Sequence, residues 1–198
     1  MLVSTDSEKI AEIARNHGAE VPSLRPADLA RDDTAMWPVL RYALGEIEEL
    51  LGREFAYLML LDPTVPTRLP ADVKGAVQML DANPSADGVI GVSKPELSFF
   101  WNSWVKEEGR ITPLFRDSSR YGRRQDVPET YYVNGAMYVW RTSFVLESAE
   151  TWRHGALLPY EMERHRIVNI DDIEGFKMAE ALIEAGYYDL PWVSHRRV

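Results

Sequence analysis

The sequence has no cysteine among its 198 residues. Disulfide bonds, thiolate zinc sites and cysteine nucleophiles are therefore excluded. The absence fits a reducing compartment, and we expect the protein to be cytoplasmic. Residues 1–10 do not have the pattern of a signal peptide, because they are neither basic nor followed by a long apolar run. The longest apolar stretch, residues 55–61, is far too short to cross a bilayer, so no membrane partner is expected.

Positive charge is also scarce. Lysine and arginine number 22 against 31 aspartate and glutamate, for a net charge of −9. Phosphate backbones select basic surfaces, so nucleic acid is not an expected partner. A small phosphorylated ligand is compatible with this charge, because it needs only a few arginines, backbone amides and usually a metal ion. The glycine-rich dinucleotide pattern, the P-loop pattern and the GxSxG elbow are missing too, which disfavours dehydrogenases, P-loop proteins and serine hydrolases.

Strand and helix patterns alternate along the chain. Residues 2–5 have the pattern of the end of a strand, and residues 55–61 are continuously apolar, as in a strand buried on both faces of a parallel sheet. Extended sequence is expected again at 87–92 and 131–140. Apolar side chains at helical spacing predict helices that begin at Asp6 or Ser7, at Asp33 or Thr34, after Arg68, and at Asp171 or Asp172. This alternation predicts an α/β fold with a mostly parallel sheet.

Residues 93–131 interrupt the alternation. Aromatic side chains, a Lys-Glu-Glu-Gly turn and an apolar segment at 111–115 predict a β-hairpin arm. An arginine-rich loop follows, with Arg116, Arg120, Arg123 and Arg124. These arginines could clamp phosphate or carboxylate groups, or form a solvated loop partly balanced by Asp117 and Asp126; the second interpretation is favoured.

Ligands of open parallel sheets bind beyond the carboxyl ends of the strands. That rule selects residues 4–6, 62–68, 91–94 and 134–135. The segment 62–68 is the most informative, because two prolines stiffen it while Asp62, Thr64 and Arg68 offer an acceptor, a hydroxyl and a cation. It either orients a polyhydroxylated or phosphorylated ligand, or is a stiff turn that caps the next helix.

The sequence Asn169-Ile170-Asp171-Asp172 follows extended sequence and precedes a helix. Carboxylates at a strand end can hold Mg²⁺ while a triphosphate supplies the remaining oxygen ligands. A plain helix cap is the alternative, and composition alone favours it because aspartate is common in a first turn.

Four stretches in order resemble one family, the acylneuraminate cytidylyltransferases or CMP-sialic acid synthetases, and especially their bacterial relatives that activate legionaminic-type nonulosonic acids. They are VSTDSEKIAEIARNHGAEVPSLRP at 3–26, LDPTVPTR at 61–68, RRQDVPETYYVNGAMYVWR at 123–141 and NIDDIEGFKMAEALI at 169–183. The resemblance implies a Rossmann-like nucleotidyltransferase fold, a three-layer sandwich, as one domain over 1–198. It also implies that residues 93–131 are an inserted arm through which a homodimer forms.

The resemblance further implies an enzyme that transfers CMP from CTP to a nonulosonic acid of sialic, legionaminic or pseudaminic type. The anomeric hydroxyl of the sugar would attack the α-phosphorus of CTP, with Mg²⁺, and pyrophosphate would leave. Carried over by motif, the catalytic residues would be Arg68 and Asp171, with Asp171 also the metal ligand. The substrate-binding residues would be Asp62, Thr64, Arg124, Asn134 and Gly135.

The chain departs from the family pattern at several positions. The sialic acid branch has glutamine where Asp62 stands, and aspartate there is closer to the legionaminic-type branch. Val65 and Thr67 replace serine and leucine. Asn169 replaces an aspartate of the metal motif, which removes a charge from that site.

The family also begins with a strand and a loop of the form Arg-x-Gly-Ser-Lys, followed by Lys-Asn, that grips the triphosphate. No such loop occurs here, so we expect the chain to be N-terminally truncated. It is then either a cytidylyltransferase in shortened form or a non-catalytic homologue that only dimerises or binds the sugar. A relative that uses another nucleotide, such as GTP, is a weaker third interpretation.

Overall fold

The computed structural model of the chain describes residues 1–147, 151–188 and 190–191. Contacts between Cα atoms divide the chain into two compact units. The first comprises residues 1–59, 84–88 and 139–157, and the second comprises 60–83, 89–138 and 158–198.

The first unit carries the helices α1 (Glu8–Asn16), η1 (Ala27–Leu29), α2 (Met36–Leu51), α5 (Thr142–Glu147) and η4 (Trp152–His154). Of the two predicted caps of α1, Ser7 is the actual one, since its side chain accepts a hydrogen bond from the amide of Ile10. The predicted start of α2 is wrong. The helix begins at Met36, because Thr34 Oγ1 instead donates to the backbone oxygen of Asp28 and Asp33 pairs with Arg31.

Aromatic side chains form the core of the first unit. Trp37 of α2 meets Trp140 edge to face with ring centroids 5.1 Å apart, and it meets Phe144 of α5 at 5.9 Å. Both tryptophans are almost completely buried. Edge-to-face pairs of this kind stabilise a core beyond the area that they bury.

The predicted strand end at residues 2–5 is reduced to a single parallel bridge between Leu2 and Glu20. The amide of Val3 donates to the Glu20 oxygen at 2.9 Å, and the amide of Glu20 donates to the Met1 oxygen at 2.8 Å.

A four-stranded sheet has the order β1-β5-β2-β6. The strands are β1 (Tyr57–Leu60), β2 (Gly88–Ser93), β5 (Tyr132–Arg141) and β6 (Leu157–Glu161). Every residue of β2 is buried, as expected of a central strand. The expectation of full burial was wrong for β1, whose residues are all half-buried, because β1 lies at an edge of the sheet.

Backbone hydrogen bonds give the strand directions. β2 and β6 are parallel, since Asp87 bonds Ala156 where both strands begin and Met162 bonds Val92 where both end. β5 runs the other way, because Arg141 at its end bonds Asp87 at the start of β2.

The same reasoning applies to β1. The amide of Thr142, directly after β5, donates to the oxygen of Ala56, directly before β1. β1, β2 and β6 therefore share one direction and β5 opposes them. The amino end of β5 consequently lies at the same sheet edge as the carboxyl ends of the other strands.

The second unit adds α3 (Pro70–Asp81), η5 (Arg164–Arg166) and α6 (Ile173–Glu184). α3 packs on the sheet through β6, since a Cβ added at Gly75 would lie only 2.7 Å from the Tyr160 hydroxyl. α6 is held by a small apolar cluster of Val168, Ala179, Tyr188 and Leu190.

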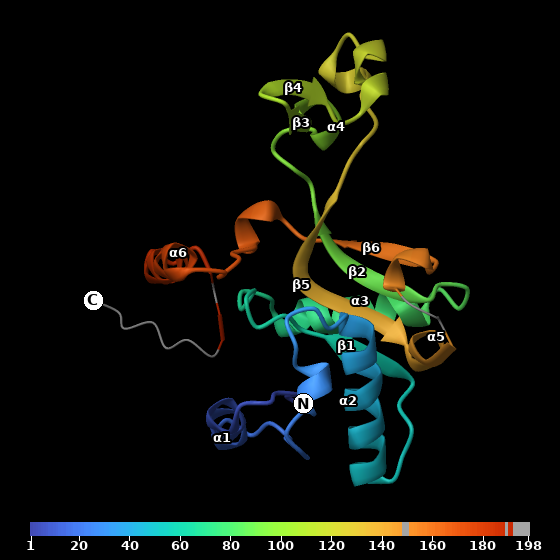
Figure 1. The fold of residues 1–198 in the computed structure, drawn as a ribbon, viewed down its shortest axis with the longest axis vertical. Helices are drawn as coiled ribbons and strands as arrows, with labels where there is room; N and C mark the ends of the chain where they lie inside the picture. Colours follow the sequence, from blue (N-terminus) through green and yellow to red (C-terminus); the bar gives the residue numbers. More distant parts are fainter. Residues whose placement is uncertain (148–150, 189, 192–198) are drawn as a thin grey trace. The chain divides into compact units, whose positions relative to one another are not determined.

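Residues between β2 and β5 form the predicted arm. It contains α4 (Phe99–Asn102), β3 (Trp104–Glu107), β4 (Arg110–Pro113), η2 (Arg116–Arg120) and η3 (Arg124–Asp126). The predicted hairpin is confirmed: β3 and β4 pair antiparallel, and Glu108 and Gly109 make the turn with φ of 48° and 79°. Figure 1 shows two extended stretches that lead from β2 out to the arm and back to β5.

Candidate active site

The loop Asp62–Arg68 directly follows β1 and is held in shape by its own arginine. Nη1 of Arg68 donates to the backbone oxygens of Asp62, Val65 and Ala136 at 2.9, 2.6 and 2.8 Å. Burial lowers the pKa of Arg68, and the nearby Asp62 carboxylate opposes that shift. Arg68 therefore fixes the loop against β5, while its catalytic role stays a prediction.

This loop does not cap the helix that follows it. Leu69 is the N-cap residue of α3, and its amide donates to Oδ2 of Asp72, inside the helix, at 2.7 Å. The interpretation of the loop as a capping turn is therefore wrong, and the side chains of Asp62 and Thr64 line a cavity instead.

Asn134 and Gly135 lie inside β5, although the sequence placed them at a strand's carboxyl end. They still reach the predicted edge of the sheet, because β5 runs antiparallel to its neighbours. The Asn134 side chain is buried and fixed: Nδ2 donates to Ser93 Oγ, and Oδ1 accepts from the amide of Ala136, both at 3.0 Å. Ser93 Oγ in turn donates to the Met162 oxygen at 2.7 Å.

Gly135 interrupts the regular strand with a φ of +73°. A Cβ at this position would lie 3.4 Å from Val65 Cγ2 and 3.9 Å from Asp62 Oδ2. Both distances are ordinary contacts, so glycine is needed here for the left-handed backbone conformation rather than for space.

The segment Ile167–Asp172 forms a further wall. The amide of Ile170 donates to the Thr64 oxygen at 2.7 Å, which ties this segment to the loop. Asp172 is the N-cap of α6 and accepts from the amide of Gly175 at 2.7 Å. Asp171 does not cap the helix; its carboxylate accepts a hydrogen bond from Asn169 Nδ2 at 2.5 Å. The sequence left a helix cap and a metal ligand as alternatives for this segment. In the structure, Asp172 is the cap and the neighbouring Asp171 is the candidate metal ligand.

These three segments enclose one cavity of about 450 Å³. Its walls are Asp62, Thr64, Val65, Tyr132, Val133, Asn134, Gly135, Tyr138, Ile167, Asn169 and Asp171. A larger opening of about 690 Å³ along α6 shares Ile167, Asn169 and Asp171 with it. The lining combines carboxylates and amides with tyrosines and branched apolar side chains, which suits a polyhydroxylated ligand that also has apolar substituents.

The charge of Asp171 affects the pKa of the other cavity carboxylate, Asp62. The pKa of Asp62 is raised, first because burial disfavours its charged form and further because of the negative charge of Asp171, while Arg68 acts in the opposite direction. Within the described residues, no cluster of at least three histidine, aspartate or glutamate side chains could hold a metal ion. Mg²⁺, however, is commonly bound by one or two carboxylates together with substrate phosphates, and this pair fits that mode.

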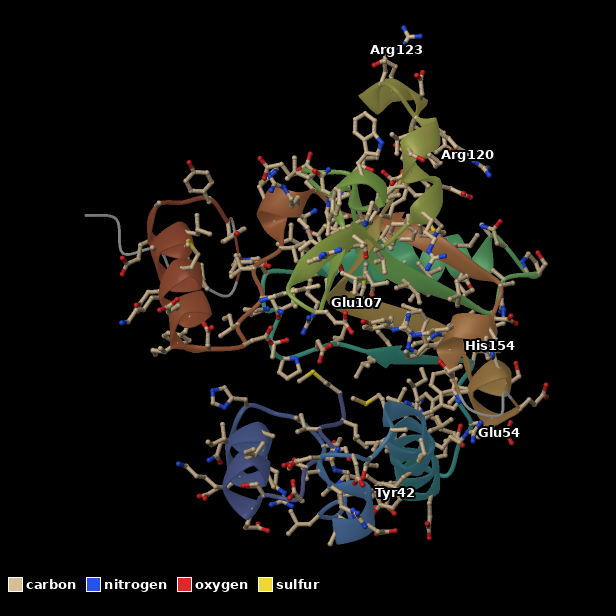
Figure 2. All side chains as sticks on the ribbon, turned by 45° about the horizontal axis from the view of Figure 1, so that its top comes forward. Tyr42, Glu54, Glu107, Arg120, Arg123 and His154 are labelled. Carbon is tan, nitrogen blue, oxygen red and sulfur yellow. The ribbon has the colours of Figure 1, made fainter. Side chains whose placement is uncertain are left out.

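The arginine-rich loop lies on the arm. Arg120 and Arg123 are exposed and pair with Asp117 and Asp126 at 3.4 and 3.5 Å. Figure 2 shows both side chains at the outer part of the arm. The side chain of Arg124 lies outside the part that the structure describes, so its role as a substrate ligand stays a prediction.

The other two predicted strand-end segments contribute no residue to the cavity lining. Residues 4–6 belong to the first unit. In the other segment, residues 91–94, Lys94 forms an exposed ion pair with Glu129 at 2.6 Å and lies over the Tyr131 ring.

Sequence reasoning missed the apolar part of the cavity wall. Tyr132, Val133 and Tyr138 belong to β5, where alternation along a strand could have placed Tyr132 and Tyr138 on the side of Asn134. It also missed the ion pair between the buried Asp72 and the partly buried Arg166, for which a local pattern gives no signal.

No helix among the described residues is long and apolar enough to span a membrane. No protein-family profile matches the chain. Its fold is similar to a solved structure of CMP:2-keto-3-deoxy-manno-octonic acid synthetase complexed with CTP, with a TM-score of 0.60, 14% identity, and coverage of 93% of this chain and 80% of the other.

Curated relatives are more similar in sequence. Post-translational flagellin modification protein B of Campylobacter coli is 31% identical, over 93% of this chain and 77% of its own length. CMP-N,N'-diacetyllegionaminic acid synthase of Campylobacter jejuni is 30% identical, over 92% and 76%. N-acylneuraminate cytidylyltransferase of Escherichia coli is 25% identical, over 90% of this chain and 41% of its own length. The chain belongs to the family of these cytidylyltransferases, the CMP-nonulosonic acid synthases.

Proposed function

We propose that this protein transfers CMP from CTP to a nonulosonic acid of sialic, legionaminic or pseudaminic type. The oxygen of the sugar's anomeric hydroxyl bonds to the α-phosphorus, the bond from that phosphorus to the bridging oxygen breaks, and pyrophosphate leaves. The observation that carries the proposal is that residues of three motif stretches, 61–68, 123–141 and 169–183, line one cavity. Such a reaction depends mainly on positioning and charge neutralisation.

The residues of the cavity divide by chemistry. Asp62 and Thr64 on the loop offer an acceptor and a hydroxyl to sugar hydroxyl groups. Asn134 and Gly135 form the wall on β5, where the Asn134 amide is anchored to Ser93 and Gly135 adopts a left-handed backbone conformation. Arg68 keeps the loop rigid through three backbone oxygens. The tyrosines and Val133 can pack against acyl or methyl groups of the sugar.

We also propose Mg²⁺ as cofactor, held by Asp171 with Asp62 nearby and by phosphate oxygens of the nucleotide. When bound, the ion neutralises phosphate charge. The Asn169 side chain is neutral and adds no negative charge to the site. Its amide instead donates a hydrogen bond that orients Asp171. The cytoplasm, where CTP is made, is the compartment that we propose.

A homodimer through the arm is the further part of this proposal. The arm exposes Leu97, Phe99, Trp104, Ile111, Leu114 and Phe115, whose exposed fractions run from 39% to 64%. An isolated two-stranded hairpin is only marginally stable in water. A second copy of the arm would cover these side chains and give the hairpin a partner.

The test is pyrophosphate release by the full-length protein with CTP, Mg²⁺ and a panel of sialic, legionaminic and pseudaminic acids. We expect turnover with at least one sugar, formation of the CMP-sugar by mass spectrometry, and loss of turnover with EDTA. GTP, UTP and ATP serve as nucleotide controls.

Absence of pyrophosphate release with every sugar and nucleotide would reject the enzyme. Sugar binding by calorimetry would then identify a non-catalytic homologue. Equal turnover with and without Mg²⁺ would reject the proposal that Mg²⁺ is the cofactor, and the proposed transfer reaction would stand.

A further inference from the structure

An ion pair between a buried carboxylate and a partly buried guanidinium, Asp72 and Arg166, lies outside the residues that line the cavity. Asp72, in the first turn of α3, is only 4% exposed. Arg166 meets it with both terminal nitrogens, Nη2 to Oδ2 at 2.6 Å and Nη1 to Oδ1 at 3.3 Å. This is the two-pronged arrangement that fixes a guanidinium and a carboxylate in one relative orientation.

Asp72 has two further neighbours. Its Oδ2 accepts the Leu69 amide at 2.7 Å, so the same carboxylate caps α3 at the end of the Asp62–Arg68 loop. The Tyr160 ring crosses α3 at Gly75, where a Cβ would come within 2.7 Å of the hydroxyl. The pKa of Tyr160 is raised by burial first and then by the Asp72 charge, with Arg166 opposing.

The pair joins two of the three chain segments that form the cavity walls. Asp72 follows the loop that carries Asp62 and Thr64, and Arg166 directly precedes Ile167, where the second wall begins. Two further hydrogen bonds join the same two segments. The Val168 amide donates to Thr67 Oγ1 at 3.5 Å, and the Ile170 amide donates to the Thr64 oxygen at 2.7 Å. The Val168 bond is long, so the ion pair is the short polar contact at the start of the wall and the Ile170 bond is the short contact farther along it.

We propose that Asp72 and Arg166 are positioning residues that set the separation of the Asp62–Thr64 wall from the Asn169–Asp171 wall. Desolvation offsets much of the attraction in a buried ion pair, so stability alone is a weak reason to have one. Orientation is what the two-pronged contact supplies. The catalytic consequence rests on the proposed function, because a displacement of about 1 Å in such a site can reduce the rate about 100-fold.

Three changes separate positioning from stability. Arg166→Lys keeps the charge but loses the two-pronged contact. Asp72→Asn keeps an acceptor for the Leu69 amide but leaves Arg166 without its counter-charge. Asp72→Asn combined with Arg166→Gln removes both charges together, which avoids an unpaired buried charge and restores much of the stability. Arg164→Gln is the matched control, since Arg164 lies in the same short helix and forms an exposed pair with Glu96.

Hydrogen exchange followed by mass spectrometry or NMR gives a readout that needs no activity. In Arg166→Lys and in the double variant, the Val168 and Ile170 amides should exchange at least about 10-fold faster than in wild type. The amides in the middle of α3 should not change, and Arg164→Gln should match wild type. Unchanged exchange at Val168 and Ile170 in both variants would overturn the proposal.

Steady-state kinetics give the second readout. The double variant should recover the wild-type Tm yet show a KM for the sugar and a Mg²⁺ requirement raised about 10-fold or more. Recovery of both KM and Tm would reduce the pair to a stabilising contact and reject the positioning role. A wild-type protein without turnover would reject the proposed function, and the exchange experiment would still decide the pair.

Discussion

At the scale of single residues, Asp62 is the most informative side chain of the cavity. It is half-buried and lies close enough to Arg68 and Asp171 to be affected by the charges of both. Its pKa is raised because burial outweighs the attraction of Arg68, with Asp171 adding to the shift. A carboxylate in this setting is destabilised by its own charge at neutral pH, which is typical of a group placed for binding rather than for stability.

The first prediction concerns this charge. Because the folded protein holds the Asp62 proton more tightly than the unfolded chain, with its ordinary pKa of 3.8, ionisation opposes folding at higher pH. Asp62→Asn should therefore raise the Tm at pH 7, and the gain should shrink as the pH falls towards 4. Thermal unfolding across this pH range measures it, with Asp32→Asn at an exposed position as control. A Tm that falls at pH 7 would contradict the assignment.

The second prediction concerns Gly135. Its φ of +73° is costly for any residue with a Cβ, while the added atom would meet Val65 Cγ2 at an ordinary contact distance of 3.4 Å. Gly135→Ala should lower the free energy of unfolding by about 1–2 kcal/mol. Chemical denaturation is the measurement. Gly122→Ala is the matched control, since a Cβ there meets no atom within 4 Å; equal losses in the two variants would refute the argument.

At the scale of elements, the start of α6 separates two functions on adjacent residues. Asp172 caps the helix by accepting the Gly175 amide at 2.7 Å, whereas Asp171 lines the cavity and makes no capping bond. Gly175 permits this arrangement, because a Cβ there would lie 2.7 Å from the Asn169 oxygen.

The third prediction follows from this separation. Asp172→Ala should lower the free energy of unfolding by about 1 kcal/mol and leave the Mg²⁺ response unchanged. Asp171→Ala should change the free energy of unfolding by less than about 0.5 kcal/mol and weaken the Mg²⁺ dependence of turnover. Denaturant titrations and rates at graded Mg²⁺ concentrations measure the pair. The opposite pattern would exchange the two roles.

At the scale of the whole molecule, the arm is the surface through which we propose that two copies of the chain associate. It has an aromatic cluster of its own, in which Phe100 stacks on Phe115 at 5.1 Å and meets Tyr121 at 5.4 Å. The hairpin outside that cluster remains exposed along all of β4.

The fourth prediction tests this surface. Ile111 is 64% exposed and pairs across the hairpin with Lys106, so Ile111→Glu removes an apolar contact while adding an ion pair within the hairpin. We expect the wild type to have the mass of a dimer and this variant to shift towards monomer in light scattering or sedimentation. Leu50→Glu, on the exposed side of α2, should stay dimeric. A monomeric wild type at micromolar concentration would reject the interface.

Much of the fold was predictable from local patterns. The apolar run before Asp62 predicted β1, apolar side chains at helical spacing after Arg68 predicted α3, and the Lys-Glu-Glu-Gly turn predicted the hairpin of the arm. These signals are local because each depends on the propensity and burial pattern of one element. The start of α2 was not predictable this way, since two polar residues before it bond to other groups.

The sequence by itself determined the α/β class, the rigid proline-containing loop and the family resemblance that the curated relatives confirm. Only the tertiary structure decided that β5 opposes its neighbours, which brings Asn134 and Gly135 to the cavity. It also decided that Asp171, not Asp172, lines that cavity, and that Arg166 pairs with Asp72 from 94 residues away. The physical reason is that strand direction and buried ion pairs depend on how distant segments pack, and short-range sequence patterns do not encode that packing.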